Sequence, residues 1–369
     1  MKLYRNARVY APKDIGVMDI LVVGDKIVAV KEHIGIAYEE LEEVDMTGMS
    51  VCPGWIDAHV HIIGGGGEDG YASLIPEISA KDCFLNGITT VVGLLGTDST
   101  VKSPEALVAK TKALKELGMS AYCLTGSYAV PTCTITGSVG KDIAMIEEVI
   151  GVKCAIADHR SSCVQVDELA KLASASYTAG LLSHKPGFVH LHTGRGKEGL
   201  RPVFDVLEET NLPIDRFRPT HMSNQPEDAV RFAKMGGRID FTAGHGVEVL
   251  NDVLDKVDRS LVTLSSDGNG SMPIWGLDHE LVGMGIGKQD ELQTTLHQLC
   301  TMGRTWEEVL PLVTSNVADS LGLHGKKGVV TAGADADLVF WKNGEIDTVV
   351  AMGKEMVKAG MFCGKEYYK

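Results

Sequence analysis

Pro53-Gly-Trp-Ile-Asp-Ala-His-Val-His-Ile-Ile-Gly-Gly-Gly-Gly-Glu68 is the stretch that organises this chain of 369 residues. It overlaps an apolar run with a Pro-Gly break, residues 49–56, which is typical of a buried strand. His59 and His61 are separated by one residue, so on a strand their side chains point to the same face. Two neutral imidazoles side by side form half of a metal site. The alternative is that the two histidines only make hydrogen bonds at a strand end. Residues elsewhere in the chain distinguish these two interpretations.

Four glycines, Gly64–Gly67, follow the histidines. Without Cβ atoms, their backbone can approach a ligand or a metal closely. The run lacks the Lys-Ser/Thr pair of a phosphate-binding loop, so we do not interpret it as one.

Composition limits the possible partners and compartments. The net charge of −14 makes nucleic acids and anionic membranes poor partners. Eight scattered cysteines without a Cys-x-x-Cys motif argue against a thiolate zinc site and fit a reducing cytosol. The amino terminus has no apolar core of a signal peptide, and no segment approaches the length of a membrane span. We therefore expect a cytoplasmic enzyme.

Residues 51–324 alternate predicted strands with helices, and 44% hydrophobic residues supply a full core. Ser103-Pro104 and Pro226 open two of the helices, and Gly118 and Gly236 end them. This alternation predicts an α/β fold, a (β/α)₈ barrel of the TIM type. An open doubly wound sheet is the alternative, weakened by the lack of a Gly-x-Gly-x-x-Gly motif. The predicted strands are 52–58, 89–94, 121–125, 151–156, 189–192, 217–221, 238–242 and 261–267.

Both ends of the chain are rich in predicted strands. Gly24-Asp25 and Gly353-Lys354 each separate two apolar runs, which is a hairpin signal. We expect residues 1–50 and 325–369 to form one small β-sandwich domain. Two independent edge hairpins, marginally stable alone, are the alternative.

Polar residues stand at the carboxyl ends of several predicted barrel strands, where barrel enzymes place their active sites. His192, His221 and Asp267 each end a strand, and Lys153 lies inside an apolar strand from which a long side chain can reach the same mouth. Each residue alone has an ordinary structural explanation, such as packing or capping. Their joint occurrence with the His-x-His pair predicts a metal site.

This constellation resembles the amidohydrolase superfamily and, within it, the isoaspartyl (β-aspartyl) dipeptidase family. The subgroup likeness rests on the stretches at 61–68, 91–98, 124–128, 135–139, 151–156, 158–160 and 264–271, and it covers nearly the whole chain. It implies two divalent ions, of which zinc is the expected one. His59, His61 and Asp267 would hold the first ion. His192 and His221 would hold the second, and Lys153, carboxylated by carbon dioxide, would bridge the two.

The resemblance also implies catalytic and substrate-binding roles. A hydroxide shared by the metals would attack an amide bond in an acidic dipeptide, with Asp267 as proton shuttle and Tyr128 stabilising the oxyanion. Glu68 would bind the free α-amino group and Arg160 a carboxylate, with Ser271 and Thr97 nearby. The partners implied are a small-molecule dipeptide and, in the family, further copies of the same chain in large homo-oligomers, including octamers.

One position departs from the family pattern. The family has an arginine three residues after the equivalent of His221, and this chain has Asn224. Asparagine cannot supply the charge, so β-aspartyl dipeptides should bind less tightly unless Arg195, Arg201 or Arg218 substitutes. Hydrolysis of another dipeptide or of an N-acyl amino acid therefore remains an alternative. A deaminase would have a glutamate at position 195, which is an arginine, and a scaffold protein would have lost ligands that are all present here.

Overall fold

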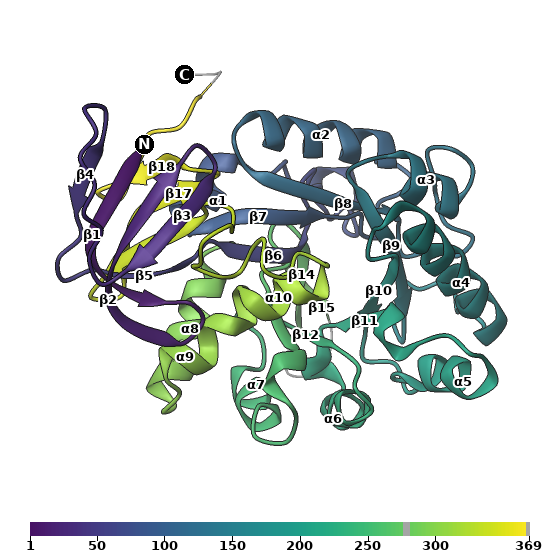
Figure 1. Ribbon diagram of the computed structural model, residues 1–369. Helices are drawn as coiled ribbons and strands as arrows, with labels where there is room; N and C mark the ends of the chain where they lie inside the picture. Colours follow the sequence, from purple (N-terminus) through teal and green to yellow (C-terminus); the bar gives the residue numbers. More distant parts are fainter. Residues whose placement is uncertain (276–280, 367–369) are drawn as a thin grey trace.

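Eight strands form the central barrel of the protein, in a computed structural model that describes residues 1–275 and 281–366 (Figure 1). Six neighbouring strands are parallel and continuously hydrogen-bonded, and β12 pairs with β13. Val60 forms a parallel bridge with Gly268, which closes the ring between the first and last strands. The (β/α)₈ prediction is therefore confirmed. The barrel strands are β6 (Trp55–Val60), β7 (Ile88–Gly93), β8 (Ser120–Gly126), β9 (Val149–Ile156), β10 (Phe188–Thr193), β11 (Phe217–Thr220), β12 (Ile239–Thr242) and β13 (Val262–Ser265).

Helices alternate with the barrel strands and cover their outer faces (Figure 1). As predicted, Pro104 opens α2, where the Ser103 hydroxyl caps the helix by accepting from the amide of Ala106 at 3.3 Å. Pro226 likewise opens α6. The helices are α1 (Ala80–Leu85), α2 (Pro104–Glu116), α3 (Val139–Met145), α4 (Val166–Ser183), α5 (Arg201–Glu209), α6 (Pro226–Lys234), α7 (Val247–Val253), α8 (Glu291–Thr301), α9 (Trp306–Val309) and α10 (Ser315–Ser320).

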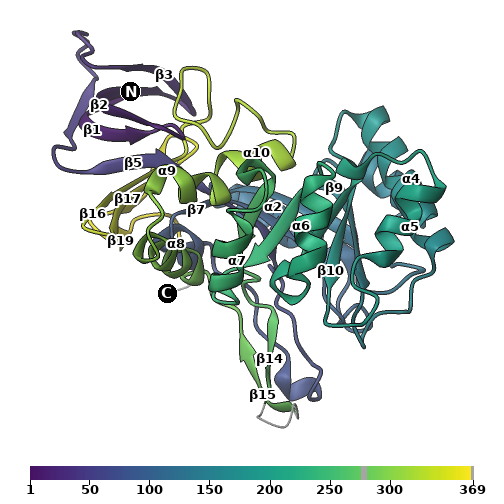
Figure 2. The ribbon, with the colours of Figure 1, turned by 90° about the horizontal axis from the view of Figure 1, so that it is seen from below.

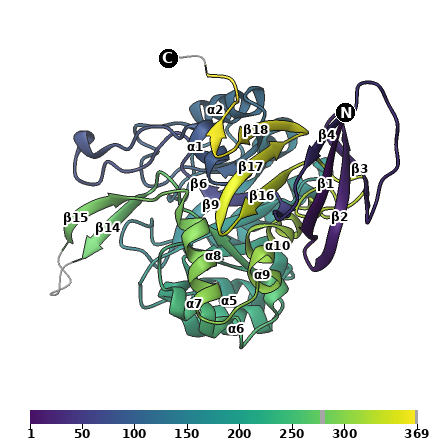
Figure 3. The same cartoon turned by 90° about the vertical axis from the view of Figure 1, so that its left-hand side faces the viewer.

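Strands from both chain ends join one nine-stranded sheet beside the barrel, so they are not two independent hairpins (Figure 3). The link between the two ends is the antiparallel pairing of β5 with β16. Tyr4 and Phe340, both fully buried, pack with ring centroids 4.9 Å apart in the core of this part. The strands are β1 (Lys2–Tyr10), β2 (Asp14–Val23), β3 (Lys26–Lys31), β4 (Glu42–Asp45), β5 (Ser50–Pro53), β16 (Leu338–Lys342), β17 (Glu345–Ala351), β18 (Lys354–Lys358) and β19 (Met361–Phe362).

The predicted strand 52–58 is in fact two strands that belong to different sheets. Cys52 and Pro53 lie in β5 of the terminal sheet, and the barrel strand begins only at Trp55. Gly54 is the crossing point, where a Cβ atom would lie 2.2 Å from Oγ1 of Thr89. The apolar pattern could not reveal this division, because both sheets bury the same residue types.

An arm projects from the carboxyl-end side of the barrel (Figure 2). It contains the hairpin of β14 (Ser271–Trp275) and β15 (Leu281–Ile286) and the neighbouring loop of residues 64–76. Asn269 ties the two together by donating from its side chain to the carbonyl of Pro76 at 2.9 Å. Among the helices of the described residues, none is long and apolar enough to cross a membrane.

Candidate active site

The six predicted metal ligands lie together inside the carboxyl end of the barrel, and all six are buried. One ligand atom each of His59, His221 and Asp267 lies within 4.8 Å of the others. Positive φ angles at His221 (60°) and Asp267 (53°) turn these residues inward just after their strands end. The six are His59 in β6, His61 directly after it, Lys153 in the middle of β9, His192 in β10, His221 directly after β11, and Asp267 two residues after β13.

Asp267 is the carboxylate at the centre of this cluster. Its Oδ1 atom lies 3.2 Å from Nε2 of His61 and 3.4 Å from Nε2 of His59. Its Oδ2 atom lies 3.9 Å from Nε2 of His221. Oδ1 is buried and has no hydrogen-bond partner among the described residues. Burial opposes ionisation, but His61, His221 and Lys153 hold the pKa of Asp267 below its usual value. The Nε2 atoms of three histidines thus lie around one ionised carboxylate, as expected of side chains that share a cation.

Lys153 is fully buried in the barrel interior, with Nζ 3.4 Å from Nε2 of His59. It makes no ion pair within the residues that the structure describes. Burial lowers the pKa of Lys153 to about 7, although Asp267 and Asp240 oppose that shift. The amine is therefore available in its neutral, nucleophilic form near neutral pH.

The tautomer of His192 is set by Asp158. Nε2 of His192 lies 2.8 Å from Oδ2 of Asp158, and because a carboxylate only accepts, Nε2 carries the proton. Nδ1 then presents its lone pair to the site, where the hydroxyl of Tyr128 donates to it at 2.6 Å. Burial raises the pKa of Tyr128 well above its usual value, so this phenol stays a proton donor. Carboxylate–histidine pairs of this kind accompany metal-binding histidines.

In two other histidines, the ring nitrogen that faces away from Asp267 contacts a neighbouring side chain. Nδ1 of His59 lies 2.9 Å from Nε2 of His190, and Nδ1 of His221 lies 2.6 Å from Oγ1 of Thr242. In both cases Nε2 is left to face Asp267. His190 was not among the predicted site residues, yet it contacts a predicted ligand directly. The alternation His190-Leu-His192 was the only signal of its inward direction.

Asp57, in the same strand as His59, fixes the loop that carries Asp267. It accepts hydrogen bonds from the amide of Ser266 at 3.0 Å and from the Ser266 hydroxyl. Burial raises the pKa of Asp57 to about 7 despite these bonds. The sequence motif contained Asp57, but only the closed barrel shows that it joins the first strand to the last.

A cavity of about 300 Å³ opens above the cluster, within the size range of small-molecule sites. On one wall, Glu68 accepts from Ser271 Oγ at 2.7 Å, from Arg160 Nη1 at 3.0 Å and from Thr97 Oγ1 at 3.3 Å. Burial opposes ionisation, but the bonds from Ser271 and Arg160 hold the pKa of Glu68 below its usual value. Four residues predicted to contact substrate therefore form one hydrogen-bonded group beside the metal ligands.

Arg160 is held by two carboxylates. Nε and Nη2 donate to Asp158, both at 2.9 Å, while Nη1 donates to Glu68. Its guanidinium lies 5.5 Å from the centre of the Tyr128 ring. Asp158 is thus shared between Arg160 and His192, a link that the sequence stretch Asp158-His-Arg160 did not reveal.

Asn224 also lines the cavity, at its other wall. Its side-chain oxygen accepts from Nε of Arg195 at 3.3 Å, and its side-chain nitrogen donates to the carbonyl of Thr193 at 3.3 Å. Of the three arginines considered as substitutes, Arg195 lines the cavity. Arg218 instead contacts Ser320 and the backbone at Asp215, and Arg201 is an exposed residue that begins α5.

The glycine run serves close backbone packing. A Cβ atom at Gly64, where φ is 75°, would lie 1.9 Å from the carbonyl oxygen of Ile75. At Gly65, a Cβ atom would lie 3.1 Å from Nδ1 of His61. The run thus lets the loop fold over a metal-ligand candidate and brings Glu68 to the cavity.

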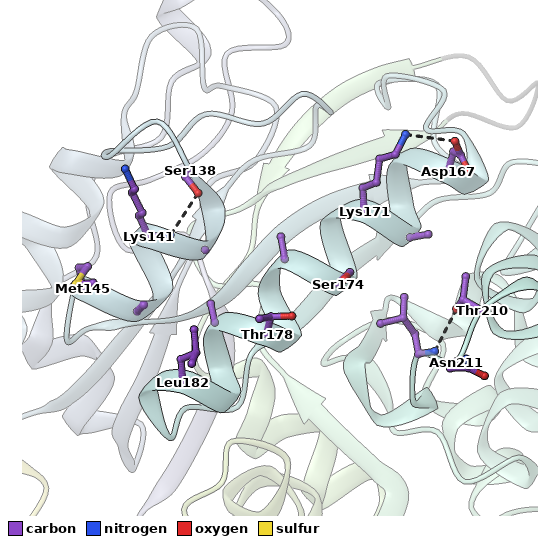
Figure 4. Close-up of a pocket in the computed structure, with 16 residues that line it drawn as sticks. Ser138, Lys141, Met145, Asp167, Lys171, Ser174, Thr178, Leu182, Thr210 and Asn211 are labelled. Atoms are coloured by element: carbon purple, nitrogen blue, oxygen red, sulfur yellow. Dashed lines mark hydrogen bonds and ion pairs between the residues drawn. The ribbon is translucent and has the colours of Figure 1, made fainter.

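A larger hollow of about 970 Å³ lies on the outer surface along α3 and α4 (Figure 4). Small residues such as Gly140, Ala175 and Thr178 line it, and Lys171 pairs there with Asp167 at 3.3 Å. Its lining contains no histidine or cysteine and none of the predicted site residues. We therefore assign the chemistry to the smaller cavity.

Comparison with known proteins gives one family match and full-length structural likenesses. Residues 50–356 match the amidohydrolase family. The crystal structure of a β-aspartyl dipeptidase from Fervidobacterium islandicum AW-1, in complex with a β-Asp-Leu dipeptide, is 37% identical, with 100% of both chains covered and a TM-score of 0.94. D-hydantoinase from Thermus sp. is 17% identical, covering 99% of this chain and 97% of that one at a TM-score of 0.73, which shows the shared fold.

A curated relative matches over a shorter region. Allantoinase from Salmonella newport is 29% identical over 163 residues, which is 42% of this chain. The match spans only 32% of the allantoinase, so this likeness concerns part of that protein.

Proposed function

This chain belongs to the amidohydrolase family, as its motifs predicted, and we propose that it is a metal-dependent β-aspartyl dipeptidase. The observation that carries the proposal is the cavity of about 300 Å³, which joins a His/Asp cluster to Glu68 and two arginines. The cavity thus offers a carboxylate and guanidinium groups to the ammonium and carboxylate groups of a short zwitterionic peptide. Full-length likeness to a dipeptidase crystallised with β-Asp-Leu supports the same substrate class.

The donor set fits divalent ions. Buried Oδ1 of Asp267 has no hydrogen-bond partner among the described residues, and Nε2 of His59, His61 and His221 each lies 3.2–3.9 Å from this carboxylate. We propose zinc, because imidazole nitrogens and carboxylate oxygens suit it. His59, His61 and Asp267 would hold one ion, and His192 and His221 a second. When bound, the ions would lower the pKa of a water and polarise the scissile carbonyl.

We propose that Lys153 is carboxylated and that its carbamate would help to hold both ions. Its neutral amine, favoured by a pKa of about 7, would add to carbon dioxide with loss of one proton to give a carbamate. A carbamate has two oxygens, whereas an ammonium has no lone pair for a metal. Its position next to His59 supports the assignment.

The residues of the chain would then divide the work of amide hydrolysis. Asp267 takes a proton from the attacking water and delivers it to the leaving nitrogen as the carbon–nitrogen bond breaks. If Nδ1 of His192 held a metal ion, the hydroxyl of Tyr128 would no longer donate to it and could donate a hydrogen bond to the developing oxyanion. Glu68 binds the free α-amino group, and Arg160 binds the α-carboxylate of the aspartyl residue. The products are free aspartate and the second amino acid.

The test is a panel of peptides with metal-loaded enzyme. We expect β-Asp-Leu to be cleaved to aspartate and leucine, and α-Asp-Leu, γ-Glu-Leu and N-acetyl-leucine to react at least about tenfold more slowly. A chelator should abolish the reaction, and no ammonia should appear. Preference for N-acetyl-leucine would favour an acylamino-acid hydrolase, and release of ammonia a deaminase.

His190 is expected to strengthen metal binding through His59. A metal ligand at Nε2 of His59 requires the proton on Nδ1, which Nε2 of His190 accepts at 2.9 Å. His190→Leu removes that acceptor and should weaken metal binding by about 10- to 100-fold, the usual effect of losing such a partner. His190→Gln keeps an acceptor oxygen and should retain most of the affinity.

Titration of chelator-stripped protein with Zn²⁺ measures this effect independently of turnover. Equal zinc affinity in His190→Leu and the unaltered protein would show that His190 only fills space. Thermal unfolding of the metal-free variants serves as the control for folding.

A further inference from the structure

We propose that Arg195, in the loop after β10, binds the C-terminal carboxylate of the dipeptide and that Asn224 positions its guanidinium. This inference rests on the proposed dipeptidase function and extends it to the residue that binds the leaving amino acid. Both side chains line the active-site cavity.

The charge balance of the cavity supports the first half of the proposal. Asp158 and Glu68 engage three nitrogens of Arg160, which leaves two of its five N–H groups for no more than one substrate carboxylate. Arg195, in contrast, makes no ion pair with any residue in the ranges 1–275 and 281–366. A dipeptide such as β-Asp-Leu carries one ammonium and two carboxylates. Glu68 and Arg160 account for one ammonium and one carboxylate, and Arg195 is the cation left for the second.

The position of Arg195 in the ring supports the same assignment. Glu68, Thr97 and Ser271 follow β6, β7 and β13, which are neighbours on one side of the barrel. Arg195 and Asn224 follow β10 and β11, and β10 is four strands from β6 in either direction around eight. The His/Asp cluster lies between these two walls. A peptide whose aspartyl end contacts Glu68 and whose amide lies over the cluster therefore directs its C-terminus toward Arg195.

Asn224 is placed to orient Arg195 rather than to bind the carboxylate by charge. Its amide nitrogen is fixed by the carbonyl of Thr193, and its oxygen accepts from Nε of Arg195. This contact occupies the Nε edge and leaves both terminal nitrogens of the guanidinium for a carboxylate. Arginine can bind a carboxylate through two parallel hydrogen bonds in this geometry, whereas the single ammonium of lysine cannot.

The experiment compares β-Asp-Leu with β-Asp-leucinamide, which lacks the C-terminal carboxylate. Arg195→Met should lower kcat/KM for β-Asp-Leu by about 10- to 100-fold, mainly through KM, since one charge-assisted interaction is lost. For the amide substrate, Arg195→Met should change kcat/KM by less than about threefold. Arg195→Lys should recover part of the loss, and Arg201→Met, an exposed arginine outside the cavity, serves as the matched control.

Asn224→Ala should lower kcat/KM for β-Asp-Leu by a smaller factor than Arg195→Met does. In the double variant it should add little to the loss caused by Arg195→Met, because both changes remove the same contact. Fully additive losses would overturn the positioning role of Asn224. An equal loss for acid and amide in Arg195→Met, or no loss for either, would overturn the carboxylate role of Arg195.

A binding measurement separates this inference from the function on which it rests. The ligands are an uncleavable analogue of β-Asp-Leu, with a methylene group in place of the scissile nitrogen, and its C-terminal amide. If the enzyme hydrolyses β-Asp-Leu but Arg195→Met binds the acid analogue as tightly as the unaltered protein, the inference fails and the function stands. If β-Asp-Leu is not hydrolysed while the analogue binds in an Arg195-dependent way, the function fails and the assignment of Arg195 stands.

Discussion

Lys153→Ala should lose bound metal and reduce hydrolysis by several orders of magnitude. The side chain sits fully buried beside His59, so its loss would remove the proposed carbamate oxygens from the centre of the ligand cluster. Metal content of protein purified without a chelator, measured by mass spectrometry, should fall from about two ions per chain to less than one. Short carboxylic acids such as acetate and propionate should restore part of both metal and activity, because they fit the space that the side chain leaves and supply the missing oxygens.

The variant Lys153→Met distinguishes an effect of losing the proposed carbamate from an effect of losing the fold. The pKa of Lys153 is about 7 in the fold against 10.5 for an unperturbed lysine, so the unfolded chain binds more protons between these values. Folding at pH 8 must release that proton, which opposes folding of the metal-free protein. Methionine has a similar shape and no charge, so metal-free Lys153→Met should unfold at the same or a higher temperature while binding no bridged pair. Normal metal content and rate in either variant would refute carboxylation.

The barrel and its ligand candidates could be predicted from the sequence because both follow from local rules. Strand ends in a barrel converge on one mouth, so histidines and an aspartate at several strand ends were expected to meet. Lys153 was identifiable because an amine inside an apolar strand needs a chemical reason. The structure adds that His221 and Asp267 reach the centre through positive φ angles just beyond their strands.

The partners of these residues could not be predicted, since they depend on contacts between distant segments. Nothing local to Asp57 indicates that it accepts from Ser266, 209 positions away. Pairing of Arg195 with Asn224 likewise requires the loops after β10 and β11 to lie side by side. The substitution of a family arginine by Asn224 therefore looked like a simple loss of charge, whereas the fold places another arginine against it.

Asp267→Asn should lower kcat for β-Asp-Leu by at least about a hundredfold, the lower range for losing a general acid–base group. The substitution is close to isosteric, and asparagine tolerates the positive φ of 53° at this position, so the loop should keep its shape. Because Asp267 is also a proposed metal ligand and one of its oxygens is replaced by an amide nitrogen, the assay is run at saturating metal, with metal content checked in the same samples. An unchanged kcat with a raised KM would assign Asp267 to substrate binding instead of proton transfer.

Proton delivery to the leaving group can be isolated by changing that group. Leucine leaves as an amine that must be protonated, whereas 4-nitroaniline is a weak base that departs with little help. If Asp267 donates that proton, Asp267→Asn should impair β-Asp-4-nitroanilide by at least about tenfold less than β-Asp-Leu. The buried carboxylate sits among His59, His61 and His221, where a water or a leaving nitrogen held by the same cluster would lie beside it. Equal losses for the two substrates would mean that Asp267 acts only before the carbon–nitrogen bond breaks, by taking the proton of the attacking water or by holding a metal.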